Sequence, residues 1–170
     1  TGRFTANTDT GYKVEHYQQN LAGDAFVLFE TEEQNATTDT HVSATPKDYT
    51  GFTYDGTVDG TVTEGNVAGD GSLVLKLYYT RNSYDVTYAY TGTVPADASA
   101  LPEKAAVKYG ASVTVAEAAT AKGHTFSGWS SEDVRQSFIQ RLLSSSIAGK
   151  TFRMPAKDVV IEGHFDINSY

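Results

Sequence analysis

The feature that most constrains the fold of this chain is an internal repeat. Residues 51–54 (GFTY) recur as residues 123–126 (GHTF), at an offset of 72. Further along, residues 73–76 (LVLK) recur as residues 159–162 (VVIE), at an offset of 86. The chain therefore contains two related units in tandem, and each unit is expected to bury its own apolar residues.

The first strand of each unit shows the shorter offset, because residues 12–17 (YKVEHY) resemble residues 84–88 (YDVTY). The two offsets differ by 14 residues, which are extra in the second unit and lie between Phe126 and Val159. The second unit thus carries an insertion within a shared core. The predicted domains are residues 1–8, the end of a preceding repeat or a tail, residues 9–82, and residues 83–168.

Most of the chain alternates apolar and polar residues between Gly, Asp and Thr, a pattern typical of β-strands and their turns. In one stretch Leu73, Leu75 and Leu77 alternate with Val, Lys and Tyr, so one face of a strand is strongly apolar. Strands are expected near residues 11–18, 25–32, 40–45 and 73–80 in the first unit, and near 84–91, 106–109, 111–115 and 158–166 in the second.

The insertion carries a different pattern, since its apolar residues are spaced as on one face of an α-helix. Ser130 fits an N-cap, and Glu132 and Asp133 complement the helix dipole. So short a helix is marginal alone in water and must bury its apolar face. It packs on its own unit, docks into the groove of a protein partner, or is disordered. The candidate partner-binding residues, on a helix over about residues 131–147, are Val134, Phe138, Ile139, Leu142 and Leu143.

The net charge of -8 at pH 7 disfavours two classes of partner. Nucleic acids need a clustered basic surface, and anionic membranes also attract cationic segments. No apolar run approaches the ~18 residues of a membrane span, so no membrane insertion is expected. Cysteine is absent, which excludes disulfides, thiol catalysis and thiolate metal sites.

No residue pattern indicates catalysis. The four histidines lack the spacing of a zinc motif, and His16 and His164 are expected on strand faces. Oxygen-bearing side chains in residues 55–70 are of the kind that calcium prefers, but Asp-Gly turns explain them better. The sequence therefore predicts no catalytic residue, no cofactor and no metal. The oxygen-bearing residues are Asp55, Asp59, Glu64, Asn66 and Asp70.

Aromatic residues are abundant, with 11 tyrosines and a single tryptophan, Trp129. Aromatic side chains on strands mostly build the cores of small domains and cross-strand pairs. An exposed row of tyrosines would instead offer a surface on which sugars stack. Core packing is the expectation for the tyrosines and for Trp129.

Motifs in both units resemble known families. The first unit, with YKVEHYQ, GFTYDG and GDGSLVLKLYYTRN, is similar to the mucin-binding-protein (MucBP-like) repeats of Gram-positive surface proteins. The second, with KGHTFSGW and FRMPAKDVVIEGHF, resembles the Listeria–Bacteroides or internalin-type B repeat. The resemblance implies β-grasp-like units in a secreted or wall-anchored protein, and no catalytic residues. The insertion departs from the familiar pattern.

Together these observations predict an α+β, mainly β protein of two small β-grasp-like units, the second with an inserted amphipathic helix. The expected function is that of a non-catalytic, extracellular repeat module, monomeric within a longer array and anchored to the cell surface through other parts of its parent. It would act as a stalk, or as an adhesin for a host glycoprotein or mucin. One alternative is a recognition or display module that uses the inserted helix, and another is an accessory domain of a secreted hydrolase.

Overall fold

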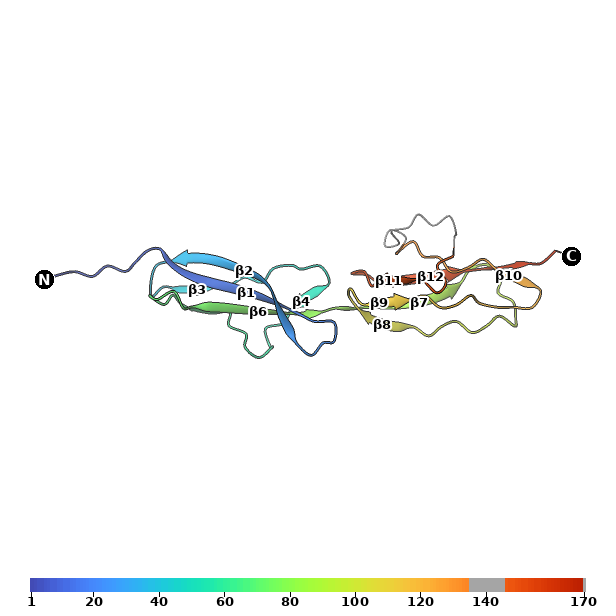
Figure 1. Ribbon diagram of the computed structural model, residues 1–170, viewed down its shortest axis with the longest axis horizontal. Helices are drawn as coiled ribbons and strands as arrows, with labels where there is room; N and C mark the ends of the chain where they lie inside the picture. Colours follow the sequence, from blue (N-terminus) through green and yellow to red (C-terminus); the bar gives the residue numbers. More distant parts are fainter. Residues whose placement is uncertain (135–145, 170) are drawn as a thin grey trace. The chain divides into compact units, whose positions relative to one another are not determined.

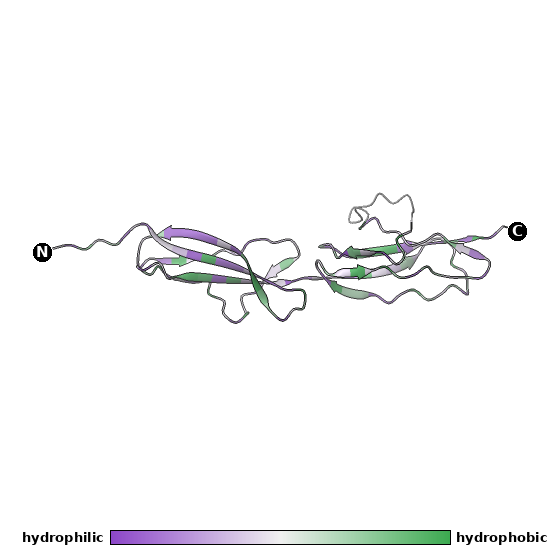
Figure 2. Cartoon of the chain, in the orientation of Figure 1, coloured by the Kyte–Doolittle hydropathy of each residue, from purple (hydrophilic) through white to green (hydrophobic). Residues whose placement is uncertain are grey.

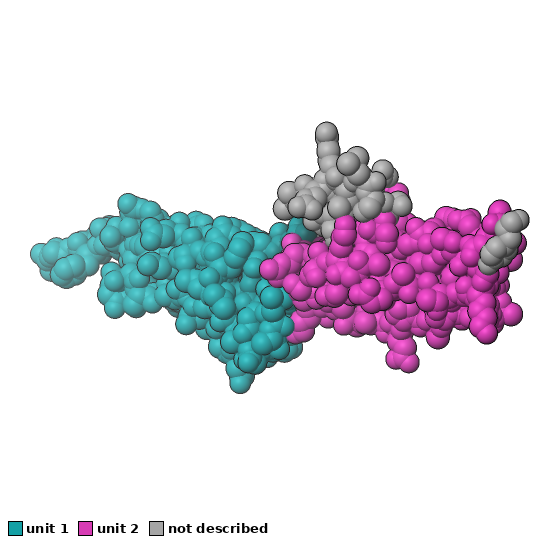
Figure 3. All heavy atoms as spheres, turned by 45° about the vertical axis from the view of Figure 1, so that its right-hand side comes forward, with its two compact units in different colours: residues 1–81 teal, residues 82–170 magenta. Residues whose placement is uncertain are grey.

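The structure is a computed structural model that describes residues 1–134 and 146–169. It divides into two compact units, Thr1–Arg81 and Asn82–Tyr170 (Figure 3). Each unit has its own core, and every strand pair among the described residues lies within one unit. The described strand pairs and the core of each unit therefore involve residues of that unit alone.

The first unit is built from six strands (Figure 1). They include two long strands at its start and one long strand at its end, with short strands between them. Their bounds are β1 (Thr10–Gln19), β2 (Phe26–Ala36), β3 (His41–Ser43), β4 (Phe52–Tyr54), β5 (Glu64–Asn66) and β6 (Val74–Arg81).

The described part of the second unit has seven strands, most of them short. Their bounds are β7 (Ser83–Tyr90), β8 (Ala105–Lys108), β9 (Ser112–Thr114), β10 (His124–Phe126), β11 (Thr151–Arg153), β12 (Val159–Gly163) and β13 (Phe165–Ile167).

In the first unit the main sheet has the order β2-β1-β6-β4, and β3 pairs with β5 in a small second sheet. The two central strands, β1 and β6, run parallel over six residue pairs, from Lys13 opposite Val74 to Gln18 opposite Tyr79. β2 and β4 then add antiparallel, one on each side. The first and the last strand of the unit are thus direct neighbours in the middle of its sheet.

The second unit repeats this plan in smaller pieces. Its sheet has the order β12-β7-β8, with β7 and β12 parallel from Val86 opposite Val159 to Tyr90 opposite Gly163. β10 pairs with β13, and β9 pairs with β11, each antiparallel. The strand that is continuous as β6 in the first unit is interrupted here at His164, between β12 and β13.

The core of the first unit lies on one face of its main sheet. Leu75, Leu77 and Tyr79 of β6 are fully buried, and Val14 of β1 packs with them. These residues alternate with more exposed ones, because successive side chains of a strand point to opposite faces. In Figure 2 β6 is largely green, the hydrophobic end of the scale, whereas much of β2 is purple. Burial of the apolar side chains of β6 is therefore the main hydrophobic stabilisation of the sheet.

The core of the second unit is organised around Trp129, of which 1% is exposed. Its ring contacts the rings of Tyr88, Tyr90 and Phe126, with centroid distances of 5.1, 5.7 and 4.8 Å. Its Nε1 donates a hydrogen bond of 2.8 Å to the backbone oxygen of Glu117. The prediction that Trp129 is a core residue is confirmed, since a buried indole N–H needs such an acceptor.

Two glycines allow this aromatic core to close. A Cβ on Gly163 would lie 2.3 Å from the ring of Phe126, and one on Gly128 would lie 2.5 Å from Cβ of Ser146. Gly128 also has a φ of +91°, in a region that other L-residues rarely adopt. Any side chain at either position would displace part of the core.

The strand pairing of the two units can be compared residue by residue. Phe52 lies opposite Arg81 and His124 lies opposite Ile167, which matches the offsets of 72 and 86. The central pair is shifted by two residues, because Val86 faces Val159 where those offsets would place Ile161. The offset of 72 therefore does not describe the first strand in the structure. His16 lies opposite Leu77, and the position equivalent to Leu77 in the second unit is Gly163. Gly163 lies opposite Tyr90, so Tyr90 is the structural counterpart of His16.

The predicted α+β class is wrong, because the structure contains no helix in any residue that it describes. In residues 1–134 and 146–169 no helix covers a sheet as a β-grasp-like unit would require, and the described ends of the predicted insert helix, residues 131–134 and 146–147, are not helical. Val134 and Ile147 enter the second core instead, at 0% and 7% exposure. The described fold is all-β, and in that part of the chain there is no helix long and apolar enough to cross a membrane.

The burial of Val134 gives a first prediction. The substitution Val134→Ala should lower the free energy of unfolding of the second unit by on the order of 1–3 kcal/mol, because it leaves a cavity in a packed core. Chemical denaturation followed by the fluorescence of Trp129, the single tryptophan of the chain, measures this unit. The control Val160→Ala alters a residue that is 41% exposed and should change stability by less than about 0.5 kcal/mol. Equal losses in both variants would contradict the placement of Val134.

Candidate functional site: a polar cluster in the first unit

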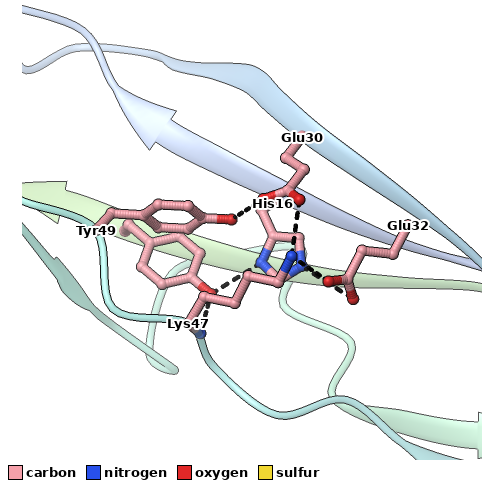
Figure 4. Close-up of polar contacts among 6 residues, drawn as sticks. His16, Glu30, Glu32, Lys47 and Tyr49 are labelled. Carbon is pink, nitrogen blue, oxygen red and sulfur yellow. Dashed lines mark hydrogen bonds and ion pairs between the residues drawn. The ribbon is translucent and has the colours of Figure 1, made fainter.

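The densest group of interacting charged side chains in the described residues lies on the inner face of the first sheet (Figure 4). β1, β2 and β6 supply four of its members. The irregular segment between β3 and β4 supplies the other two and folds over that face. The polar cluster consists of His16, Glu30, Glu32, Lys47, Tyr49 and Tyr79.

Lys47 is the cation that joins the two carboxylates. Its Nζ lies 2.7 Å from Oε1 of Glu30 and also forms a close ion pair with Glu32. Hydrogen bonding to Lys47 holds the pKa of each carboxyl group below its ordinary value, and the two carboxylates raise the pKa of Lys47. All three groups therefore stay charged near neutral pH.

Tyr49 secures Glu30 from the other side. Its hydroxyl group donates a hydrogen bond of 2.5 Å to Oε2 of Glu30. Burial, followed by this hydrogen bond, raises the pKa of Tyr49 well above its ordinary value. The tyrosine thus stays protonated and acts as a fixed donor to the carboxylate.

His16 lies beneath these groups and is fully buried. Its Nδ1 lies 2.9 Å from the hydroxyl group of Tyr79, which also accepts a hydrogen bond of 3.0 Å from the backbone N–H of Lys47. The other ring nitrogen of His16, Nε2, lies 3.6 Å from Oε2 of Glu32. This distance is too long for a good hydrogen bond but short enough for attraction.

This arrangement suits a structural role better than acid–base chemistry. A general acid–base pair needs carboxyl groups whose pKa values are pushed apart, whereas both acids here are stabilised in the ionised form by one lysine. His16 is sealed from solvent by the segment that carries Lys47 and Tyr49. The cluster therefore fastens that irregular segment to the sheet.

The residues considered as calcium ligands serve turns and a cross-strand contact. Oδ1 of Asp55 accepts hydrogen bonds from the backbone and side chain of Thr57, and Oδ1 of Asp70 accepts one from the backbone N–H of Ser72. His41 bridges Glu64 and Asn66 across β3 and β5 on an exposed face. These contacts confirm the interpretation as turns for Asp55 and Asp70. Among the described residues, no three His, Cys, Asp or Glu side chains are grouped as a metal site would require.

The predicted partner-binding residues are only partly visible. Val134 is buried beside Asp133, whose carboxylate pairs with Lys157 at 2.8 Å and accepts a hydrogen bond from the N–H of Val160 at 3.0 Å. Phe138, Ile139, Leu142 and Leu143 lie outside the described residues, and their role in binding stays a prediction.

Sequence reasoning missed the polar cluster. One local signal was present, since Glu30 and Glu32 are two residues apart on a strand and so share a face. That face is the buried one, which a pair of acids does not indicate. Lys47 comes from a segment without periodic pattern, so nothing in the sequence paired it with them.

The fold and the cluster together define a class: two small β-units, the first of which uses a polar cluster to fasten an irregular segment to its sheet. A protein-family comparison goes further. The family model for the divergent InlB B-repeat domain matches residues 84–169, just over half of the chain. The chain therefore belongs to the divergent InlB B-repeat domain family. It is a repeat protein of the kind found in bacterial surface proteins.

Two further comparisons add little. A solved structure, "Streptococcal High Identity Repeats in Tandem (SHIRT) domains 3-4 from cell surface protein", is 14% identical and aligns over 92% of this chain and 98% of that chain. The TM-score is 0.25, so the superposition does not establish a shared fold. No curated protein matches the chain. The MucBP-like resemblance of the first unit stays a prediction.

The cluster generates a prediction about pH. The folded pKa values of Glu30 and Glu32 lie below their ordinary values, so their stabilising effect is present above the unfolded pKa and is lost as the pH falls through the folded pKa. In Lys47→Gln the two carboxylates repel each other without a cation between them. This variant should unfold at lower urea concentration than the parent at pH 7, and the difference should shrink by about pH 3.

Amide signals of β1 in NMR spectra, recorded through a urea titration at both pH values, measure the first unit. The control is Lys13→Gln, since Lys13 is half exposed and lies 3.9 Å from a highly exposed Glu33. This control should have little effect at either pH. A loss in Lys47→Gln that persists undiminished at pH 3 would mean that Lys47 acts through packing rather than charge.

Proposed function

We propose that this chain is a non-catalytic, load-bearing spacer module of a Gram-positive surface protein, positioned outside the cell and anchored by other parts of its parent. Membership of a repeat-domain family supports the surface role. The observation that carries the spacer role is the parallel pairing of the first strand of each unit with a late strand, β1 with β6 and β7 with β12.

This pairing fixes how tension enters each unit. Within the first unit the chain enters at the start of β1 and leaves at the end of β6, and the register places these points at opposite ends of the strand pair. Tension between them pulls the strands past each other, so several hydrogen bonds must break together. Pulling from one end would break the same bonds one at a time. The geometry thus favours resistance to force along the chain direction.

A sugar-binding adhesive surface has less support. Tyr79 is fully buried, Tyr88 and Tyr90 pack on Trp129, and Tyr17 stacks on Tyr78 with a centroid distance of 4.9 Å. A hydrogen bond to Glu15 raises the pKa of Tyr17 to about 12, so its hydroxyl group is also engaged. These rings are used mainly against one another, as expected of small-domain cores. Adhesion to a host glycoprotein or mucin therefore remains the second proposal.

Single-molecule pulling tests the spacer role. The chain has no cysteine, so handles can be attached at introduced pairs. Thr8→Cys with Ser83→Cys loads β1 and β6 in shear, and Thr8→Cys with Ser72→Cys pulls on the two strand starts at the same end of the sheet. All three positions are exposed.

The first pair should require a several-fold higher unfolding force than the second, because it loads the six paired positions of β1 and β6 together. Equal thermal stability of the two doubly substituted proteins serves as the control. Equal unfolding forces would contradict the load-bearing role.

A further inference from the structure

The outer edge of β2 is a long unpaired strand edge in the described part of the first unit. β2 has 11 residues and stands at the end of the sheet order β2-β1-β6-β4 (Figure 1). An edge strand presents N–H and C=O groups that can pair with another strand. The polar cluster involves side chains on one face of β2, whereas the position of β2 at the end of the sheet order leaves its outer edge without a neighbouring strand in the described residues.

The edge has an apolar half and an acidic half. Val27, Leu28 and Phe29 are 60%, 47% and 59% exposed, and Glu30 begins an acidic run that ends with Glu33. Figure 2 shows the change from green to purple along the strand. Lys47 neutralises only one of the two charges on Glu30 and Glu32. Glu33, with a side chain that is 81% exposed, pairs with Lys13 at 3.9 Å, so two lysines face three acids along this half of the strand. Exposed apolar residues beside a net acidic charge are typical of a binding surface.

The second unit treats its corresponding edge differently. β8, which pairs with its first strand, has four residues, follows Lys104 and ends with Lys108. Short length and lysines are the usual protection of an edge against pairing. β2 is almost three times as long, carries no lysine and no proline, and departs from regular pairing at one point, where its register against β1 shifts at Phe29. Its acids protect it against acidic and neutral strands, and they attract a cationic one.

The net charges of the two units also indicate a cationic partner for the edge of β2. Residues 1–81 contain 12 acidic and 5 basic side chains, a net charge of -7, whereas residues 82–170 contain 9 and 8, a net charge of -1. A second copy of the chain would bring -7 against -7. A basic partner would instead be attracted over a distance comparable to the Debye length.

We propose that the outer edge of β2 binds an extended, cationic peptide segment of a partner protein by strand addition. The segment would pair its backbone with β2 as a fifth strand of the sheet. Its apolar side chains would cover Val27, Leu28 and Phe29, and its basic side chains would lie along residues 30–33. This inference goes beyond the spacer role, and neither depends on the other.

The test uses the full chain and three synthetic peptides of about 12 residues, long enough to span β2. One alternates Lys and Val, one has the same sequence with an N-methyl group on every residue, so that neither of its edges can donate a hydrogen bond, and one alternates Glu and Val. Hydrogen exchange and NMR shifts of backbone amides report where each peptide binds, and titration reports its affinity. The Lys/Val peptide should protect β2 amides and shift few signals of residues 82–170. Its affinity should fall as salt is added.

N-methylation of every residue should abolish binding, because it removes the donors of both peptide edges without changing the charge. The Glu/Val peptide should not bind. Glu33→Lys should weaken binding of the Lys/Val peptide about fivefold at low salt. The matched control Glu162→Lys makes the same charge reversal on an exposed residue of β12 and should leave binding unchanged.

Three outcomes would overturn the proposal. Equal binding of the N-methylated peptide would show attraction by charge without strand addition. Absence of Lys/Val binding at millimolar concentration would show that the edge is not a docking site. Protection of β2 amides in the free protein, together with self-association in sedimentation experiments, would show that a second copy occupies the edge.

Discussion

The parallel hydrogen-bonded pair formed by the first strand and a late strand is the interaction on which each unit depends. It requires the chain to travel through the rest of the unit before the pair can form. In the first unit the intervening chain supplies β2 and β4, which complete the sheet on either side. In the second it supplies β8 and the segment with Trp129. The sheet order is therefore a consequence of this one pairing, and the two cores are what make it favourable.

The two units stabilise the same pairing with different chemistry. His16 of the first unit contacts Tyr79, and its structural counterpart Tyr90 contacts Phe165 at a ring distance of 5.2 Å. The polar pair needs the surrounding hydrogen bonds and ion pairs, because a buried imidazole is costly without partners. The aromatic pair needs space, which Gly163 supplies to Phe126. The same structural position, His16 in the first unit and Tyr90 in the second, thus belongs to a polar cluster in one unit and to an aromatic core in the other.

Much of the framework could be predicted from the sequence, because a long strand with one buried face has an apolar residue at every second position. Leu75 and Leu77 revealed β6 in this way. β4, β5, β10 and β11 have three residues each, too few for any period to be recognised. The helix prediction for the insert was wrong because the spacing of apolar residues indicates which side chains are buried and does not by itself specify the backbone conformation that buries them. Val134 satisfies that spacing from a non-helical position in the core.

The polar cluster was beyond sequence reasoning for a related reason. Its members come from three strands and an irregular segment, and only the folded register brings Lys47 to Glu30 and Glu32. The two-residue shift of the central pair was hidden too, since either register keeps the same side chains facing inward.

All described strand pairs close within a single unit, and this has a consequence for how such proteins change over generations. Duplication or deletion of a whole unit leaves the pairing and core of the remaining units intact. The number of such units in a chain can therefore change by recombination between repeated gene segments at little expense in stability. Substitutions inside a unit face the opposite situation, because each must fit a core that no neighbouring unit can replace.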